Sequence, residues 1–208
     1  MSAYLIPTGP GEAEFVEKRS RFLGHVRQVQ SEEEARAFIA QMKKQYYDAR
    51  HNCWCYVLKD GPERYSDDGE PQGSAGLPML EVFRKAGVYN AVCVVTRYFG
   101  GVLLGTGGLL RAYTKSAKDA LDAAGLSMVR PWILAELRCP YSLAERLKLE
   151  VAAAQGAVED MEYAADVLIK ALIPEEGLEG FSRRVTELSA GDLAVKPVDT
   201  VFKAAAVK

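Results

Sequence analysis

The sequence contains few cysteines, with only Cys53, Cys55, Cys93 and Cys139 in 208 residues. Their spacing forms no disulfide framework, which excludes a small secreted fold stapled by disulfides. The first eleven residues also lack a positively charged segment followed by an apolar run, so we expect no secretory leader there. These features predict free thiols and a cytoplasmic location.

Long hydrophobic runs and an excess of one charge are also absent. The most apolar stretch, residues 91–110, is broken by Arg97 and by five glycines, so it is a poor candidate for a membrane span and we expect no membrane partner. The 26 Lys and Arg residues nearly balance the 28 Asp and Glu residues. This balance excludes a globally basic nucleic-acid binder, although it allows a local basic patch. A composition with 49% hydrophobic and 26% charged residues is typical of a globular protein.

Residues 1–130 are predicted to form the first of two domains. A Ser-x-x-Glu capping box, Ser31 followed by Glu34, marks the start of a helix that continues to Tyr47. Periodicity and turn residues indicate the other elements. They are a hairpin over 14–29, a strand over 51–58, a loop over 60–76, a helix over 77–86, a strand buried on both faces over 91–96, and a helix from 108 to 125.

Residues 131–208 are predicted to form the second domain, with the boundary near Arg130. The first part has 17 basic and 15 acidic residues, a net charge of +2, whereas the second has 9 and 13, a net charge of −4. The second part shows strands over 133–139, 157–163, 166–173 and 193–198, with helices that begin at Ser142 and at Gly177. This βαββαβ order is that of a ferredoxin-like domain, so the fold class is α+β.

The segment from His51 to Cys55 contains residues of types that bind zinc or carry out nucleophilic catalysis. On a strand, His51, Cys53 and Cys55 share one face, but ligands at this spacing converge poorly on one tetrahedral ion. A cysteine nucleophile with His51 as its base meets the same difficulty. Buried cysteines on a strand face are the favoured interpretation, and we expect no metal and no cofactor.

A second candidate is the acidic loop that contains Asp67, Asp68 and Glu70. Paired carboxylates can hold a divalent cation or act as acid and base, so Asp67 and Asp68 are catalytic candidates together with His51. Carboxylates in a loop rich in Gly and Pro are more often a solvated turn.

The glycine-rich segment between the last strand and the last helix of the first part is the strongest local feature. It comprises Gly100, Gly101, Gly105, Thr106, Gly107 and Gly108. Such a turn presents backbone N–H groups that bind anions, but the order of residues matches neither a Walker A loop nor a dinucleotide fingerprint. Alternatively, these glycines serve only to allow a tight chain reversal and close packing of the helix. Nearby, Arg97, Tyr98, Phe99 and Arg111 favour a nucleic-acid surface, unless the two aromatic residues belong to the core.

Three segments together, residues 48–53, 65–76 and 96–108, resemble the IMPACT family, specifically its bacterial YigZ-like branch. The resemblance covers most of residues 1–130, and the βαββαβ part resembles the small domain that bacterial members carry after it. The resemblance implies a first domain similar to domain 2 of a small-subunit ribosomal protein and to domain IV of elongation factor G. It implies a second domain similar to domain V of that factor.

The resemblance also implies a role in translation, because the eukaryotic relatives look like regulators of translation. It places Arg50, His51 and Asn52 in characteristic segments with the acidic loop and residues 97–101, so we expect these segments to converge on one groove. The leading hypothesis is a non-enzymatic regulator that contacts RNA or the ribosome near the glycine-rich turn. A small hydrolase or phosphate-ligand enzyme that uses His51 with Asp67 or Asp68 is the alternative, and a protein partner for the second domain is a third hypothesis.

Overall fold

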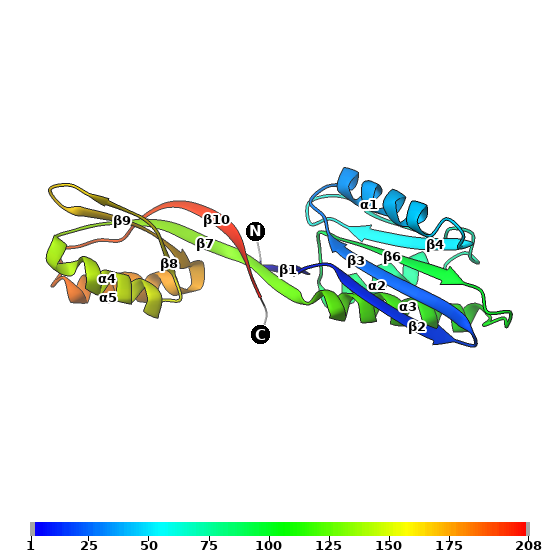
Figure 1. Cartoon of the computed structure of the whole chain (residues 1–208). Helices are drawn as coiled ribbons and strands as arrows, with labels where there is room; N and C mark the ends of the chain where they lie inside the picture. Colours follow the sequence, from blue (N-terminus) through cyan, green and yellow to red (C-terminus); the bar gives the residue numbers. More distant parts are fainter. Residues whose placement is uncertain (1–2, 207–208) are drawn as a thin grey trace. The chain divides into compact units, whose positions relative to one another are not determined.

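The structure is a computed structural model that describes residues 3–206, and it divides into two compact units. The main segment of one unit is Tyr4–Met128 and that of the other is Val129–Ala205. Both units are mixed α+β, as predicted, and each has its own hydrophobic core (Figure 1). Within residues 3–206, no helix is long and apolar enough to cross a membrane.

The Tyr4–Met128 unit is built on a five-stranded sheet with the order β2-β3-β6-β4-β5. Its strands are β2 (Gly11–Glu17), β3 (Ser20–Gln28), β4 (His51–Val57), β5 (Glu63–Ser66) and β6 (Ala91–Tyr98). Each neighbouring pair is antiparallel. The central strand β6 is buried from Ala91 to Arg97, in agreement with its run of small apolar and β-branched residues.

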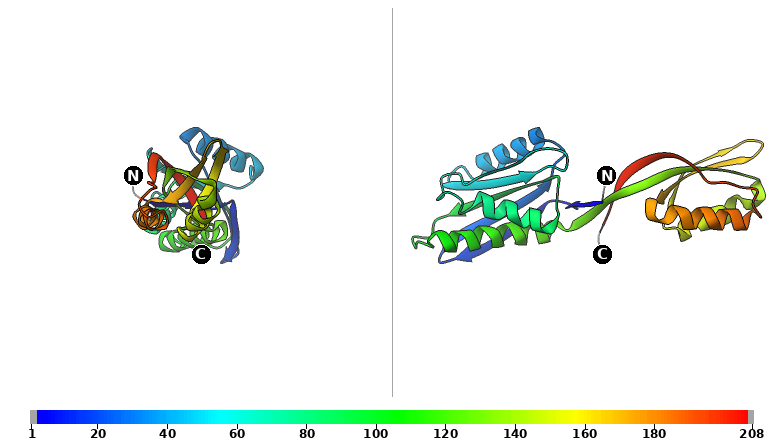
Figure 2. Two further views of the ribbon diagram at one scale, coloured as in Figure 1. Left: turned by 90° about the vertical axis from the view of Figure 1, so that its left-hand side faces the viewer. Right: turned by 180° about the vertical axis from the view of Figure 1, so that it is seen from behind.

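Helices cover both faces of this sheet (Figures 1 and 2). Helix α1 (Glu32–Gln45) packs on one face, where Phe38 and Ile39 join the core formed with β4 and β6. Helices α2 (Gly76–Ala86) and α3 (Thr106–Ala124) pack on the other face. The predicted N-cap is confirmed, because Ser31 Oγ accepts the backbone N–H of Glu34. The second bond of a capping box differs, since the Glu34 carboxylate accepts the backbone N–H of Gln30 and not that of Ser31.

The second unit has the predicted βαββαβ order. Its elements are β7 (Leu126–Cys139), α4 (Tyr141–Ala153), β8 (Ala157–Tyr163), β9 (Val167–Pro174), a short 3₁₀ turn (Glu175–Gly177), α5 (Leu178–Leu188) and β10 (Lys196–Ala206). Strand β9 lies between β7 and β8 in antiparallel register, and β10 also pairs with β7. The short strand β1 (Tyr4–Pro7) belongs to the first unit. Leu147 of α4 and Phe181 of α5 are fully buried against Leu137 and Ile169 of the sheet.

The structure corrects several element boundaries. The predicted loop over 60–76 contains β5, which the sequence did not indicate because pairing with β4 supplies its hydrogen bonds. Helix α3 begins at Thr106, so Gly107 and Gly108 lie in its first turn and not in the preceding loop. Strand β7 begins at Leu126 and not at residue 133, and α4 begins at Tyr141, with Pro140 at its N-cap instead of Ser142.

The packing of α3 on β2 depends on Gly11. A Cβ atom at this position would lie 2.1 Å from the carbonyl oxygen of Ala120 and 2.5 Å from the backbone nitrogen of Ala124. Because both neighbours are backbone atoms, α3 would have to move away from the sheet. We expect Gly11→Ala to lower the free energy of unfolding in urea by about 1–3 kcal/mol.

The control for this substitution is Gly9→Ala, where an added Cβ has no neighbour within 4 Å. We expect its unfolding midpoint to match that of the parent protein. Equal midpoints for the two variants would contradict the close approach of α3 to β2.

Candidate functional site

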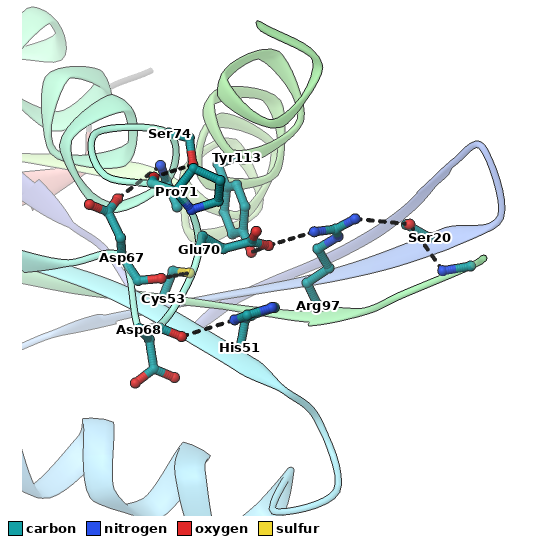
Figure 3. A network of polar contacts seen from close by, with 12 residues as sticks. Ser20, His51, Cys53, Asp67, Asp68, Glu70, Pro71, Ser74, Arg97 and Tyr113 are labelled. Carbon is teal, nitrogen blue, oxygen red and sulfur yellow. Dashed lines mark hydrogen bonds and ion pairs between the residues drawn. The ribbon is translucent and has the colours of Figure 1, made fainter. Parts of the chain in front are cut away.

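A buried ion pair lies at the end of the sheet in the Tyr4–Met128 unit. Arg97 of β6 donates from Nη1 to Oε1 of Glu70 at 2.7 Å, and the side chains of Arg97 and Glu70 are only 7% and 4% exposed. The hydroxyl of Tyr113, in α3, donates to the same oxygen at 2.8 Å. Figure 3 shows the three side chains meeting between the sheet and the helix. The pair therefore joins a strand, a loop and a helix.

The same arginine connects β6 to the turn between β2 and β3. Ser20 Oγ accepts the backbone N–H of Gly100 at 3.1 Å and a longer bond, 3.5 Å, from Arg97 Nη2 (Figure 3). A Cβ at Gly100 would lie 2.0 Å from the carbonyl carbon of Arg19. Glycine is required here because the two backbones approach too closely for any side chain.

The carboxylates of Asp67 and Asp68 have structural partners. Asp67 accepts the backbone N–H groups of Gly73, Ala75 and Gly76 at 2.8–3.0 Å, and so it caps the start of α2 from outside the helix. Asp68 accepts from Lys43 Nζ at 2.6 Å and from the Asn52 backbone N–H at 2.8 Å. In Figure 3 both carboxylates point away from His51, so they form no acid–base pair with it.

His51 and Cys53 lie on the same face of β4, as predicted. Their side chains hydrogen-bond to backbone carbonyl groups and not to each other. His51 Nδ1 is 2.9 Å from the carbonyl oxygen of Asp68, so in the neutral ring Nδ1 carries the proton. Cys53 Sγ donates to the carbonyl of Asp67 at 3.0 Å, and burial raises the pKa of its thiol well above the ordinary value. Among residues 3–206 no group of three or more His, Cys, Asp or Glu side chains could hold a metal ion.

A groove of about 380 Å³ lies over the ion pair, and we call it the main groove. It is lined by residues of all three segments that we expected to converge. These are Arg50, His51, Glu70, Pro71, Arg97, Phe99, Leu103, Leu104, Gly105, Thr106 and Leu109. Arg50 is exposed at the mouth, whereas Arg97 and Glu70 form the floor. Phe99 is 48% exposed and Leu103 is 81% exposed, so the groove has an apolar wall open to solvent.

Not every predicted site residue lines the main groove. Asn52 and Tyr98 follow His51 and Arg97 along their strands, so they face the other side of the sheet, which α1 covers. There the Asn52 side chain accepts from Thr96 Oγ1. The Tyr98 hydroxyl donates to the Asp48 carboxylate. Gly100, Gly101, Gly107 and Gly108 flank the groove in the chain without lining it. Arg97 does line it, but as a buried ion-pair partner rather than a free cation.

Arg111 lines a second groove of about 230 Å³, which we call the basic groove. It is lined by Phe15, Glu17, Lys18, Leu104, Gly108, Arg111, Ala112 and Lys115. The two grooves are neighbours because Leu104 lines both. The exposed cations Lys18, Arg19, Arg50 and Arg111 form no ion pair with any residue that the structure describes.

The sequence did not decide whether Phe99 belongs to the core or to the surface, and it indicated no role for Pro71, Leu103 or Leu109. Apolar residues in a loop or in the first turn of a helix carry no signal that separates a groove wall from the core. The pairing of Arg97 with Glu70 was also missed, because 27 residues separate them along the chain.

Loss of the buried arginine should destabilise the fold. We expect Arg97→Met to lower the free energy of unfolding by about 3–5 kcal/mol, because Glu70 would remain as a buried, uncompensated charge. Adding Glu70→Gln should recover part of this loss, since the amide oxygen still accepts from Tyr113 without a charge. Urea unfolding of the single and double variants measures both effects.

The matched control is Arg21→Ala, which breaks the exposed ion pair with Glu14. We expect little change in stability, because solvent screens this pair. If Arg97→Met were no more destabilising than Arg21→Ala, the buried pair would not have the role assigned here.

The four cysteines are free and buried. The thiolate is the reactive form, and burial disfavours it. We expect no thiol of the folded protein to react with Ellman's reagent at the rate of free cysteine, and all four to react after unfolding in guanidinium. Rapid, stoichiometric labelling of one thiol in the folded protein would restore the cysteine-nucleophile hypothesis.

Two family models match separate parts of the chain. Residues 18–121 match the model of the Impact N-terminal domain, and residues 137–192 match a domain of unknown function (DUF1949). A solved structure described as that of a hypothetical protein is 32% identical, has a TM-score of 0.60 and aligns over 96% of this chain and 98% of its own.

Bacterial relatives match along the whole chain. The IMPACT family member YvyE of Bacillus subtilis is 35% identical over 100% of this chain and 96% of its own length. The member YigZ of Escherichia coli is 32% identical over 96% of this chain and all of its own length. The Protein IMPACT homolog of Dictyostelium discoideum is 38% identical over 48% of this chain, which is 30% of that protein. The predicted resemblance is confirmed, and the chain belongs to the IMPACT family.

Proposed function

We propose that this chain is a non-enzymatic cytoplasmic protein that acts on translation by contacting RNA, either free or within the ribosome. The link to translation comes from the eukaryotic relatives, which the resemblance identifies as regulators of translation. The cytoplasmic location is supported by the free cysteines. The contact with RNA is supported by the surface around the main groove.

The observation that carries this proposal is the set of four unpaired cations around two neighbouring grooves. Lys18 and Arg111 belong to the basic groove, Arg50 to the main groove, and Arg19 follows Lys18 in the turn beside Gly100. Exposed cations without internal partners are free to displace counterions from phosphates. The chain as a whole has a net charge of −2, so this local cluster supplies the attraction that the total charge does not.

We also propose that the two units are separate domains divided near Arg130, with the specific folds implied by the resemblance. The first would be similar to domain IV of elongation factor G and to domain 2 of a small-subunit ribosomal protein. The second would be ferredoxin-like, similar to domain V of the factor. Support comes from the division of contacts at Val129 and from the βαββαβ order with β9 between β7 and β8.

The geometry does not favour the hydrolase alternative. His51 bonds a backbone carbonyl, Asp67 caps α2, and Asp68 is held by Lys43 and the Asn52 backbone. Nothing in this arrangement brings a nucleophile within hydrogen-bonding reach of a base.

Binding of RNA and of purified ribosomes at several salt concentrations tests the proposal. We expect Arg50→Ala and Arg111→Ala each to weaken binding and to reduce the slope of log affinity against log salt concentration by about 1, because each removes one cation from a phosphate contact. Arg97 is unsuitable for this test, since its loss also breaks the buried ion pair.

Lys85→Ala is the matched control, because Lys85 is an exposed, unpaired cation in the last turn of α2 and lines neither groove. It should leave affinity and slope unchanged. The proposal would be rejected if the parent bound neither RNA nor ribosomes at low salt, or if Lys85→Ala weakened binding as much as the groove variants.

A further inference from the structure

The main groove combines an apolar wall with hydrogen-bond donors at the N-terminus of α3. Phe99 and Leu103 expose apolar surface in the lining of the groove, which also includes Gly105 and Thr106. A surface that only attracts phosphates does not require exposed aromatic and aliphatic side chains. The wall therefore indicates a ligand with a flat apolar part in addition to an anionic part.

The start of α3 offers donors that the protein itself leaves free. The N-cap is Gly105, so no side chain caps the helix, and the first turn contains no acidic residue. Among the residues that the structure describes, the backbone N–H groups of Thr106, Gly107 and Gly108 therefore have no side-chain acceptor, and they lie at the positive end of a 19-residue helix. Of these three residues Thr106 lines the main groove, so an anionic oxygen bound there would accept the Thr106 N–H.

A second, independent observation points to an acceptor in the same groove. The side chain of Arg97 lines the groove and is 93% buried, yet its Nε–H has no hydrogen-bond partner among the residues that the structure describes. A buried donor without a partner costs free energy that a ligand oxygen would recover. The charge of Glu70 does not repel such an oxygen, because Arg97 and Tyr113 already compensate it.

The shape and the wall of the groove favour an unstacked base. The volume of about 380 Å³ lies within the range of small-ligand pockets. The guanidinium carbon of Arg97 lies over the Phe99 ring, 5.5 Å from its centroid, and Phe99 remains 48% exposed. Aromatic rings placed among cations are the usual stacking platforms for bases of single strands, whereas a duplex keeps the faces of its bases covered.

We propose that the main groove holds one unpaired nucleotide of an RNA strand, with its phosphate at the N-terminus of α3 and its base against Phe99. This inference rests on the proposed contact with RNA and narrows it to single-stranded segments. It assigns different tasks to the two grooves. The main groove takes one nucleotide, and the cations of the basic groove attract the neighbouring phosphates.

The experiment compares a short labelled oligouridylate with the same strand annealed to its oligoadenylate complement, using fluorescence anisotropy. We expect the parent protein to bind the single strand at least about tenfold more tightly than the duplex. Phe99→Ala should weaken binding of the single strand by about tenfold and remove most of this preference, because stacking is lost. Tyr65→Ala is the matched control, since Tyr65 is 45% exposed and lies outside both grooves.

A second variant tests the helix donors. Thr106 is the first residue of α3, a position where proline fits the helix but lacks the N–H. We expect Thr106→Pro to bind the single strand about tenfold more weakly than Thr106→Ala, which keeps the N–H, while both variants unfold at the same temperature.

The outcomes separate this inference from the proposed function. Equal affinity for single strand and duplex, or equal effects of Phe99→Ala and Tyr65→Ala, would overturn the nucleotide site and leave general RNA contact in place. A phosphoserine peptide that bound more tightly than RNA, with the same response to the variants, would overturn it in favour of a protein partner. Absence of any RNA binding at low salt would overturn both proposals.

Discussion

The ion pair between Arg97 and Glu70 is the interaction on which the rest of the site depends. Both side chains are buried, and the pair lies where β6 ends and the acidic loop crosses toward α2. Removing one partner would leave an unpaired charge on a side chain that is almost completely buried, at a cost of several kcal/mol. The loop is therefore held against the strand, and Tyr113 extends the same constraint to α3.

Around this pair, the other charged residues of the loop hold its backbone in place. Asp67 receives three backbone N–H groups at the start of α2, and Asp68 bridges Lys43 to the backbone of β4. Carboxylates in such a loop suggest catalysis when only the sequence is considered. In the structure they bind backbone N–H groups and Lys43, and these bonds hold the loop in the conformation that forms the main groove.

Local patterns predicted most of the fold because those patterns are themselves the physical cause of the elements. The stripe of α1, the alternation along β4 and the buried run of β6 each follow from which residues must leave water. Strand β5 was not predicted, because its residues form a strand only through their pairing with β4.

For the site, the sequence indicated which segments converge. The alternation predicted for residues 51–58 already requires Asn52 to face the opposite side of the sheet from His51. Tyr98 lies beyond residue 96, where the sequence placed the end of its strand, so the sequence could not assign its face. Nor could it show that Arg97 would be paired with a residue 27 positions away.

The turn between β2 and β3 shows how the buried pair and the exposed charges are connected. Lys18 and Arg19 both adopt positive φ, 45° and 66°, as a two-residue type I′ turn requires. This conformation costs a residue that has a Cβ about 1–2 kcal/mol, and glycine would avoid that cost. Glycine would also remove two of the four unpaired cations. The strained turn is held in register by the β2–β3 ladder and by Ser20, which accepts from Gly100 and from Arg97. The network that buries one arginine thus fixes the position of two exposed cations beside the grooves, so loss of the ion pair would disturb the proposed binding surface without removing any of its exposed charges.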